Sequence, residues 1–138
     1  MKMKLWISIL GMGLPLACAT PPKNFAEQAT VGATLYGDNC ARCHGASGEG
    51  GKGPRVVGLA AGALPLDPPA GAKYRTGQFK TVSDVAGFAV KNMPPDKPGS
   101  LSADEYWEIL AFDLKANGID LGDKLLTPTL AQTLVIPR

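Results

Sequence analysis

The pentapeptide Cys40-Ala41-Arg42-Cys43-His44 is the part of this chain best suited to chemistry. Two thiols separated by two residues and followed directly by an imidazole form the attachment site of a c-type haem. The thiols of Cys40 and Cys43 can add to the two vinyl groups of the haem, and the imidazole of His44 can bind the iron. The pattern therefore predicts one covalently attached haem c.

Two other kinds of site share the Cys-x-x-Cys spacing, a structural zinc site and a thiol redox pair. Structural zinc takes four ligands, usually in two pairs, but the only other cysteine of the chain is Cys18 and its only histidine is His44. A thioredoxin-like pair lies at a strand-to-helix junction, whereas this motif follows a helical pattern and precedes a glycine-rich stretch. Both alternatives are therefore weaker than haem attachment.

A low-spin haem that carries electrons needs a second axial ligand, commonly a methionine or another histidine. Because His44 has no second histidine to pair with, bis-histidine ligation within one chain is excluded. Met93 stands in the segment KNMPP, where two prolines end the preceding helix and stiffen the following turn. The sequence predicts Met93 as the second ligand. The alternatives are a methionine that only fills a core gap, a lysine ligand and an open sixth position.

The first nineteen residues have the pattern of a secretory signal. Two lysines among the first four residues precede an apolar run from Leu5 to Leu16, which is too short to span a bilayer. We therefore expect an exported, periplasmic protein with a signal at residues 1–19. The segment Ala17-Cys18-Ala19 allows two kinds of processing, one that leaves Thr20 first and one that leaves a lipidated Cys18. Membrane contact is expected only through such an anchor.

Charge gives little information about partners. Removal of the signal takes away two lysines and no acid, so 12 basic and 12 acidic side chains would remain. This balance gives no case for binding nucleic acid and predicts weak electrostatic steering toward redox partners. Steering would be stronger if four lysines gathered around an exposed haem edge, namely Lys52, Lys73, Lys91 and Lys97. The alternative is that these lysines are scattered over the surface and solvated.

Helical periodicity and capping signals predict three main helices, at residues 26–40, from 81 to the turn at 93, and at 102–117. Glycine and proline are frequent from 45 to 77, which predicts a loop around the haem edge. Asp113 falls within the apolar stripe of the last helix. Because an unpaired buried carboxylate is costly, we expect Asp113 at the edge of the packing or hydrogen-bonded.

The chain is expected to form one domain at residues 26–118, after a short linker at 20–25. A C-terminal extension at 119–138 follows it. Thr127-Pro128 can start a short helix there, and the extension is too apolar for a free end. We therefore expect the extension to pack on the domain or on a partner.

From about residue 25 to 118 the chain resembles the class I cytochromes c. The resemblance rests on the haem motif, on Gly53-Pro54, on the Met93-Pro94-Pro95 turn and on the closing helix from Tyr106 to Gly118. It implies an all-α cytochrome c fold, with three main helices and long loops around one covalently attached haem. It also implies a close crossing of the first and last helices.

In that crossing, the resemblance pairs Gly32 and Tyr36 with Ile109 and Phe112, and Ala111 allows close approach. The chain departs from the family pattern at Asp113, a position that is normally apolar, and in its long C-terminal extension.

The resemblance suggests further cofactor-binding residues. It implies that the Pro54 carbonyl accepts the proton of the ligating histidine, which orients the ring, although Pro54 would serve equally as a plain turn former. Tyr74 and Arg75 are candidates to hydrogen-bond the haem propionates, and the alternative is that both are solvated loop residues.

These features together predict an exported monohaem electron carrier, not itself an enzyme, that passes single electrons between redox protein partners through a haem ligated by His44 and Met93. One alternative is the haem subunit of a larger periplasmic oxidoreductase, such as a dehydrogenase or a sulfur-compound oxidase. A haem sensor or peroxidase with an open sixth position is a second alternative.

Overall fold

The computed structural model describes residues 20–61, 63, 67–68, 70–72, 75 and 77–137. The expectations about the signal at 1–19, the lipidation of Cys18 and the roles of Lys73 and Tyr74 fall outside these residues. Within the described part of the chain, no helix combines the length and apolar character needed to cross a membrane.

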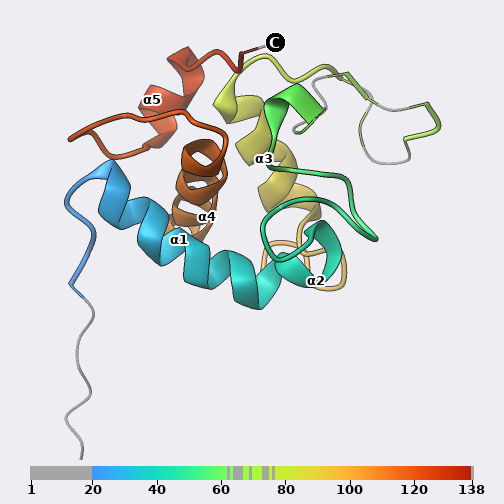
Figure 1. Cartoon of the computed structure of the whole chain (residues 1–138), viewed down its shortest axis with the longest axis horizontal. Helices are drawn as coiled ribbons and strands as arrows, with labels where there is room; N and C mark the ends of the chain where they lie inside the picture. The colour runs from blue at the N-terminus through green and yellow to red at the C-terminus, as the bar shows by residue number, and fades with distance from the viewer. Residues whose placement is uncertain are drawn as a thin grey trace, which may run out of the picture.

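The described chain is helical, with one isolated β-bridge between Thr81 and Val135. The helices are α1 (Phe25–Asn39), α2 (Ala41–His44), η1 (Leu59–Ala61), α3 (Val82–Asn92), α4 (Ala103–Ala116) and α5 (Pro128–Thr133). The three longest, α1, α3 and α4, lie where three main helices were expected, and the long connections run between them (Figure 1). The all-α class is therefore confirmed, and the three main helices with their long connections have the arrangement that the resemblance implied. The sequence pattern did not predict the short helices α2 and η1.

Local side chains fix where the two later main helices begin. At α3 the Thr81 hydroxyl accepts a hydrogen bond from the backbone N–H of Asp84, and the Asp84 carboxylate accepts one from the backbone N–H of Thr81. Ser102 and Glu105 form the same reciprocal pair at α4. Each capping box satisfies two backbone donors that a helix start leaves unpaired. The two capping boxes therefore fix the first residues of α3 and α4.

The main packing contact of the domain is the crossing of α1 and α4 (Figure 1). Gly32 of α1 lies so close to α4 that an added Cβ would overlap the backbone carbonyl of Glu108. Next to it, the rings of Tyr36 and Phe112 pack with centroids 4.8 Å apart, and Ala111 is fully buried. The crossing therefore needs a residue without a side chain at position 32, and it holds the cysteine end of α1 against α4.

The variant Gly32→Ala should lose about 3 kcal/mol or more of unfolding free energy, because the new methyl group would meet backbone that cannot move independently of α4. Gly37→Ala is the matched control on the same helix, since nothing lies within 4 Å of a Cβ placed there. That control should be neutral or more stable, by up to about 1 kcal/mol. Guanidinium unfolding of both variants measures the difference, and equal stabilities would mean that the two helices are not in contact at Gly32.

The C-terminal segment packs on the domain. Leu126, Ala131 and Ile136 are buried in the same apolar core as α1, α3 and α4. The Gln28 side chain on α1 donates to the Leu126 carbonyl at 3.0 Å and accepts from its N–H at 2.8 Å. The backbone N–H of Ile136 donates to the carbonyl of Lys80 at 3.0 Å. These contacts place the C-terminal extension over the end of the core that lies away from α2 (Figure 1).

Candidate functional site

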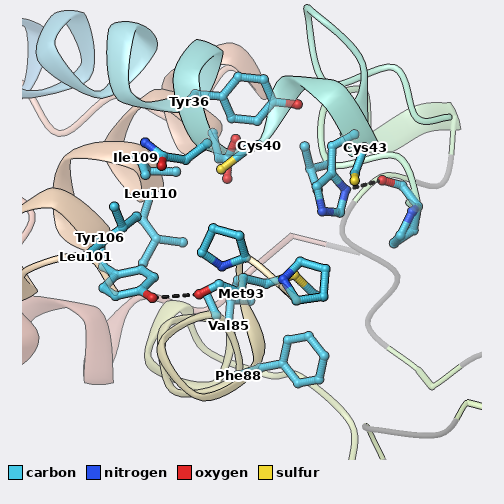
Figure 2. Close-up of a pocket in the computed structure, with 18 of the residues that line it drawn as sticks. Tyr36, Cys40, Cys43, Val85, Phe88, Met93, Leu101, Tyr106, Ile109 and Leu110 are labelled. Atoms are coloured by element: carbon cyan, nitrogen blue, oxygen red, sulfur yellow. Dashed lines mark hydrogen bonds between the residues drawn. The ribbon is translucent and has the colours of Figure 1, made fainter. Parts of the chain in front are cut away.

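A cavity of about 320 Å³ lies among α1, α2, α3 and α4. Its size is within the usual range for small-molecule and cofactor sites. Figure 2 shows Cys40 and Cys43 on one side of it and Met93 on the facing side, with Val85 and Phe88 beyond. The predicted site residues that line the cavity are Cys40, Cys43, His44, Pro54, Arg75 and Met93. Much of the remaining wall is apolar and includes Val85, Phe88, Leu101, Ile109 and Leu110.

The helix junction between α1 and α2 positions the thiols and the imidazole. Cys40 is the C-terminal cap of α1, and its N–H donates to the Tyr36 carbonyl at 2.8 Å. The single turn of α2 then follows, in which the N–H groups of Cys43 and His44 both donate to the Cys40 carbonyl, at 3.1 and 3.0 Å. The turn brings Cys43 and His44 to the same cavity as Cys40.

The ring of His44 is oriented by one hydrogen bond. Its Nδ1 lies 2.7 Å from the Pro54 carbonyl oxygen. Because a carbonyl only accepts, Nδ1 carries the proton, and Nε2 is left with a free lone pair. A metal-binding histidine usually has this arrangement, since the second bond fixes the tautomer and the ring angle. Pro54 therefore makes the contact that the resemblance implied, and Nε2 is available to a metal.

The glycine-rich loop after the motif folds back onto it. The N–H of Gly53 donates to the Cys43 carbonyl at 2.8 Å, and the N–H of Gly50 donates to the His44 carbonyl at 2.6 Å. A Cβ on Gly53 would lie 2.9 Å from Cε1 of His44. Only a glycine lets the loop pass so near the imidazole and still bring Pro54 to its Nδ1.

Met93 is held from two sides. It forms the C-terminal cap of α3, where its N–H donates to the Ala89 carbonyl at 2.8 Å. The hydroxyl of Tyr106 on α4 donates to the Met93 carbonyl at 2.6 Å (Figure 2). The sequence pattern identified Tyr106 only as part of the closing helix and did not indicate this contact. Its phenol oxygen was the one available signal, since a buried hydroxyl usually finds a partner.

An ion pair joins the two walls of the cavity at its rim. Arg42 of α2 lies 2.6 Å from Asp96, which follows the Met93 turn. The hydrogen bond from Arg42 holds the pKa of Asp96 below its usual range. Both side chains are more than half exposed, at 61% and 51%, and such exposed pairs contribute little to stability. The pair marks where the loop after Met93 meets the haem-attachment motif.

Arg75 is buried, so the alternative of a solvated loop residue is wrong for it. Its guanidinium lies over the ring of Phe79, 4.1 Å from the centroid, and lines the cavity. Such stacking orients the guanidinium plane at the cavity wall. The contact of Arg75 with a haem propionate stays a prediction.

Asp113 differs most from expectation. It is 8% exposed, lines the cavity, and its Oδ1 has no hydrogen-bond partner among the described residues. The expectation of an edge position or a hydrogen-bonded carboxylate is therefore wrong. Burial raises the pKa of Asp113 from 3.8 to about 8. Burial, followed by the charge of Asp113, also raises the pKa of the Cys40 thiol to about 12.

The raised pKa makes stability depend on pH with a definite sign. Between pH 3.8 and about 8, folded Asp113 holds a proton that the unfolded chain has lost. The contribution of Asp113 to the unfolding free energy is therefore most favourable below pH 3.8, and this advantage is lost as the pH rises through about 8. We expect the unfolding free energy of the wild type to fall across this window relative to Asp113→Asn. Guanidinium unfolding at a series of pH values measures this difference in unfolding free energy. Parallel plots of unfolding free energy against pH for the two proteins would contradict the prediction.

The residues around the cavity fit a covalently attached haem. One wall supplies two thiols and an imidazole whose Nδ1 is already engaged, and the facing wall includes a thioether. The apolar lining suits a porphyrin ring, and thioether with imidazole is a common ligand pair for electron-transfer haem iron.

Comparisons with known proteins agree with this chemistry. Residues 27–112 match the family described as cytochrome c oxidase, cbb3-type, subunit III. Among solved structures, a chain in the crystal structure of the sulfane dehydrogenase SoxCD from Paracoccus pantotrophus is similar, with 26% identity and a TM-score of 0.59. The similarity covers 99% of this chain and 69% of that chain. No curated protein matches the sequence significantly.

Proposed function

The chain belongs to the class I cytochrome c family, and from this premise we propose that it is an exported protein with one haem that passes single electrons between redox proteins. The observation that carries the proposal is the cavity itself. It brings the thiols of Cys40 and Cys43, the imidazole of His44 and the side chain of Met93 together around an apolar space.

Each of these residues has a definite task. A bound haem supplies one-electron chemistry between ferric and ferrous iron. Cys40 and Cys43 would hold the cofactor through thioether bonds, and His44 would offer Nε2 to the iron while Pro54 fixes the ring. Met93 would supply the second protein ligand to the iron and so exclude a substrate, and Tyr106 holds the Met93 backbone in place. The apolar lining excludes water and thereby favours the less charged ferrous state.

The test of this function is a redox titration of the exported, haem-loaded protein. The expected result is a reversible one-electron step and a ferrous form that binds no carbon monoxide, because Met93 would take the sixth coordination position of the iron. Rapid binding of carbon monoxide by the wild type would instead favour the haem sensor or peroxidase with an open sixth position.

A second candidate is an electron-accepting subunit of a larger oxidoreductase. The similarity to a chain of a sulfane dehydrogenase over nearly the whole of this chain favours it. The tail offers no separate support, since it packs on its own domain. Affinity purification from native cell fractions separates the candidates. A stoichiometric partner protein indicates a subunit, and a monomer indicates a mobile carrier.

The same proposal places the protein in the periplasm, on the evidence of the signal pattern at residues 1–19. The intact mass of the exported protein chooses between the two kinds of processing. A chain that starts at Thr20 means a soluble product, and a lipid mass on Cys18 means a membrane-anchored one. A chain that keeps Met1 and stays in the cytoplasm would contradict export.

A further inference from the structure

Asp113 combines three properties that the ligation of iron does not require. It is the only buried aspartate in the described part of the chain. It lines the same cavity as the residues that would hold the haem. Its Oδ1 is shielded from solvent and has no hydrogen-bond partner among the described residues. An unsatisfied carboxyl in such a place is costly when charged, so it binds a proton readily and responds strongly to nearby charge.

The groups around Asp113 are otherwise engaged. On α1, Tyr36 donates its hydroxyl to the Gly45 carbonyl at 2.8 Å, and burial raises the pKa of that hydroxyl far above its usual range. Cys40, also on α1, would be a thioether in the haem-loaded protein and would not titrate. The remaining titratable or charged groups on the cavity wall are Arg42, Cys43, His44, Arg75 and Tyr106.

Each member of that set has another role at this site. Arg42 pairs with Asp96, and Tyr106 donates to the Met93 carbonyl. Cys43 and His44 would be bonded to the cofactor, and the Arg75 guanidinium stays charged. Among the described residues of the cavity wall no rival remains, so the groups to be distinguished from Asp113 are the haem propionates, which belong to the cofactor and not to the chain.

Resting on the proposed function, we infer that Asp113 is a proton-binding site coupled to electron transfer. When one electron enters the site from a donor protein, the Asp113 carboxylate takes one proton from water and becomes a carboxylic acid. When the electron leaves to an acceptor protein, the proton returns to water. The protein would then carry a proton with each electron at pH values where the oxidised protein has Asp113 ionised.

The sign of the coupling follows from charge. The oxidised site carries one more positive charge than the reduced site and therefore stabilises a nearby carboxylate. Reduction removes that stabilisation and raises the proton affinity of Asp113. Conversely, ionisation of Asp113 favours the oxidised state, so the reduction potential falls as the pH rises. If reduction lowers the acid dissociation constant of Asp113 tenfold, the potential changes by about 59 mV between the fully protonated and fully ionised limits.

The experiment is a midpoint-potential titration of the haem-loaded protein across a pH range centred on about 8. The wild type is compared with Asp113→Asn, which keeps the shape without the charge, and with Asp113→Leu. Asp38→Asn is the matched control, because it removes an exposed carboxylate that lies on α1 near Cys40. The wild type and the control should show a potential that falls with pH, and both Asp113 variants should show little change.

Each outcome is decisive. Absence of haem in the wild type would defeat the proposed function, whereas a haem-loaded wild type with a flat profile would defeat only this inference. A pH dependence that survives in both Asp113 variants would assign the proton to the propionates and also overturn it. If neither variant matures, redox-difference infrared spectroscopy of wild type labelled with ¹³C at aspartate carboxyls decides. A label-sensitive carboxylic acid band that grows on reduction supports the inference, and its absence refutes it.

Discussion

Replacement of both Cys40 and Cys43 by alanine should give a chain from which acid and acetone extract all of the haem. In the wild type, thioether bonds to these two side chains would keep the cofactor on the polypeptide even when acid dissociates the expected ligands His44 and Met93 from the iron. The two thiols face the same cavity from the end of α1 and from α2, and among the described residues there is no other cysteine to replace them. Each single variant should keep one bond and therefore retain haem.

Arg42→Ala is the matched control for the double cysteine variant. Arg42 lies between the two cysteines and is exposed, so its loss removes the ion pair with Asp96 but leaves both thiols in place. This control should keep its haem through the extraction. Covalent haem in the double cysteine variant would move the attachment to other residues and contradict the reading of the motif.

The second large effect is expected for Met93→Ala. If Met93 is the second ligand, loss of its thioether sulfur opens the sixth position, so the ferrous protein should bind carbon monoxide and the potential should fall. Axial ligands span about 0.8 V among haem proteins, and we expect a decrease on the order of 0.1 V or more. The long-wavelength absorption band that accompanies iron–methionine bonding in ferric cytochromes should also disappear.

Two further variants separate ligation from packing at this site. Met93→Leu keeps most of the side-chain volume but has no sulfur, so it should behave as Met93→Ala does. Val90→Ala changes an exposed side chain on the same helix and should leave the potential and the spectrum unchanged. An unaltered spectrum in Met93→Leu would assign the sixth ligand to another residue.

Local patterns were sufficient for the three main helices and for the attachment motif. Capping boxes at Thr81 and Ser102 depend on residues three apart, so the sequence shows them directly. The attachment motif is likewise contained in five consecutive residues. The short helix α2 was missed because a single turn has too few residues to show a period.

Contacts between distant segments could not be predicted in the same way. The hydrogen bonds between Gln28 and Leu126 join residues 98 apart in the chain, and no local pattern indicates them. The hydroxyl of Tyr106 reaches the Met93 carbonyl only because α4 packs beside α3. Such pairings depend on how the helices cross, which a single sequence does not specify.

Asp113 shows a different limit of sequence reasoning. The helical period placed it correctly on the apolar face of α4, but the expected compensation by a hydrogen bond is not present. The cost of burial without a partner is much larger for a charged carboxylate than for a neutral carboxylic acid. Its raised pKa, about 8, allows Asp113 to stay protonated at lower pH and so to tolerate burial. Departures of this kind are common at functional sites.

The intact mass of the protein exported by cells that can mature c-type cytochromes shows directly whether one haem is covalently attached. After denaturation and removal of free cofactor, we expect a coloured chain whose mass exceeds that of the processed polypeptide by one haem. A colourless chain with the mass of the polypeptide alone would contradict it.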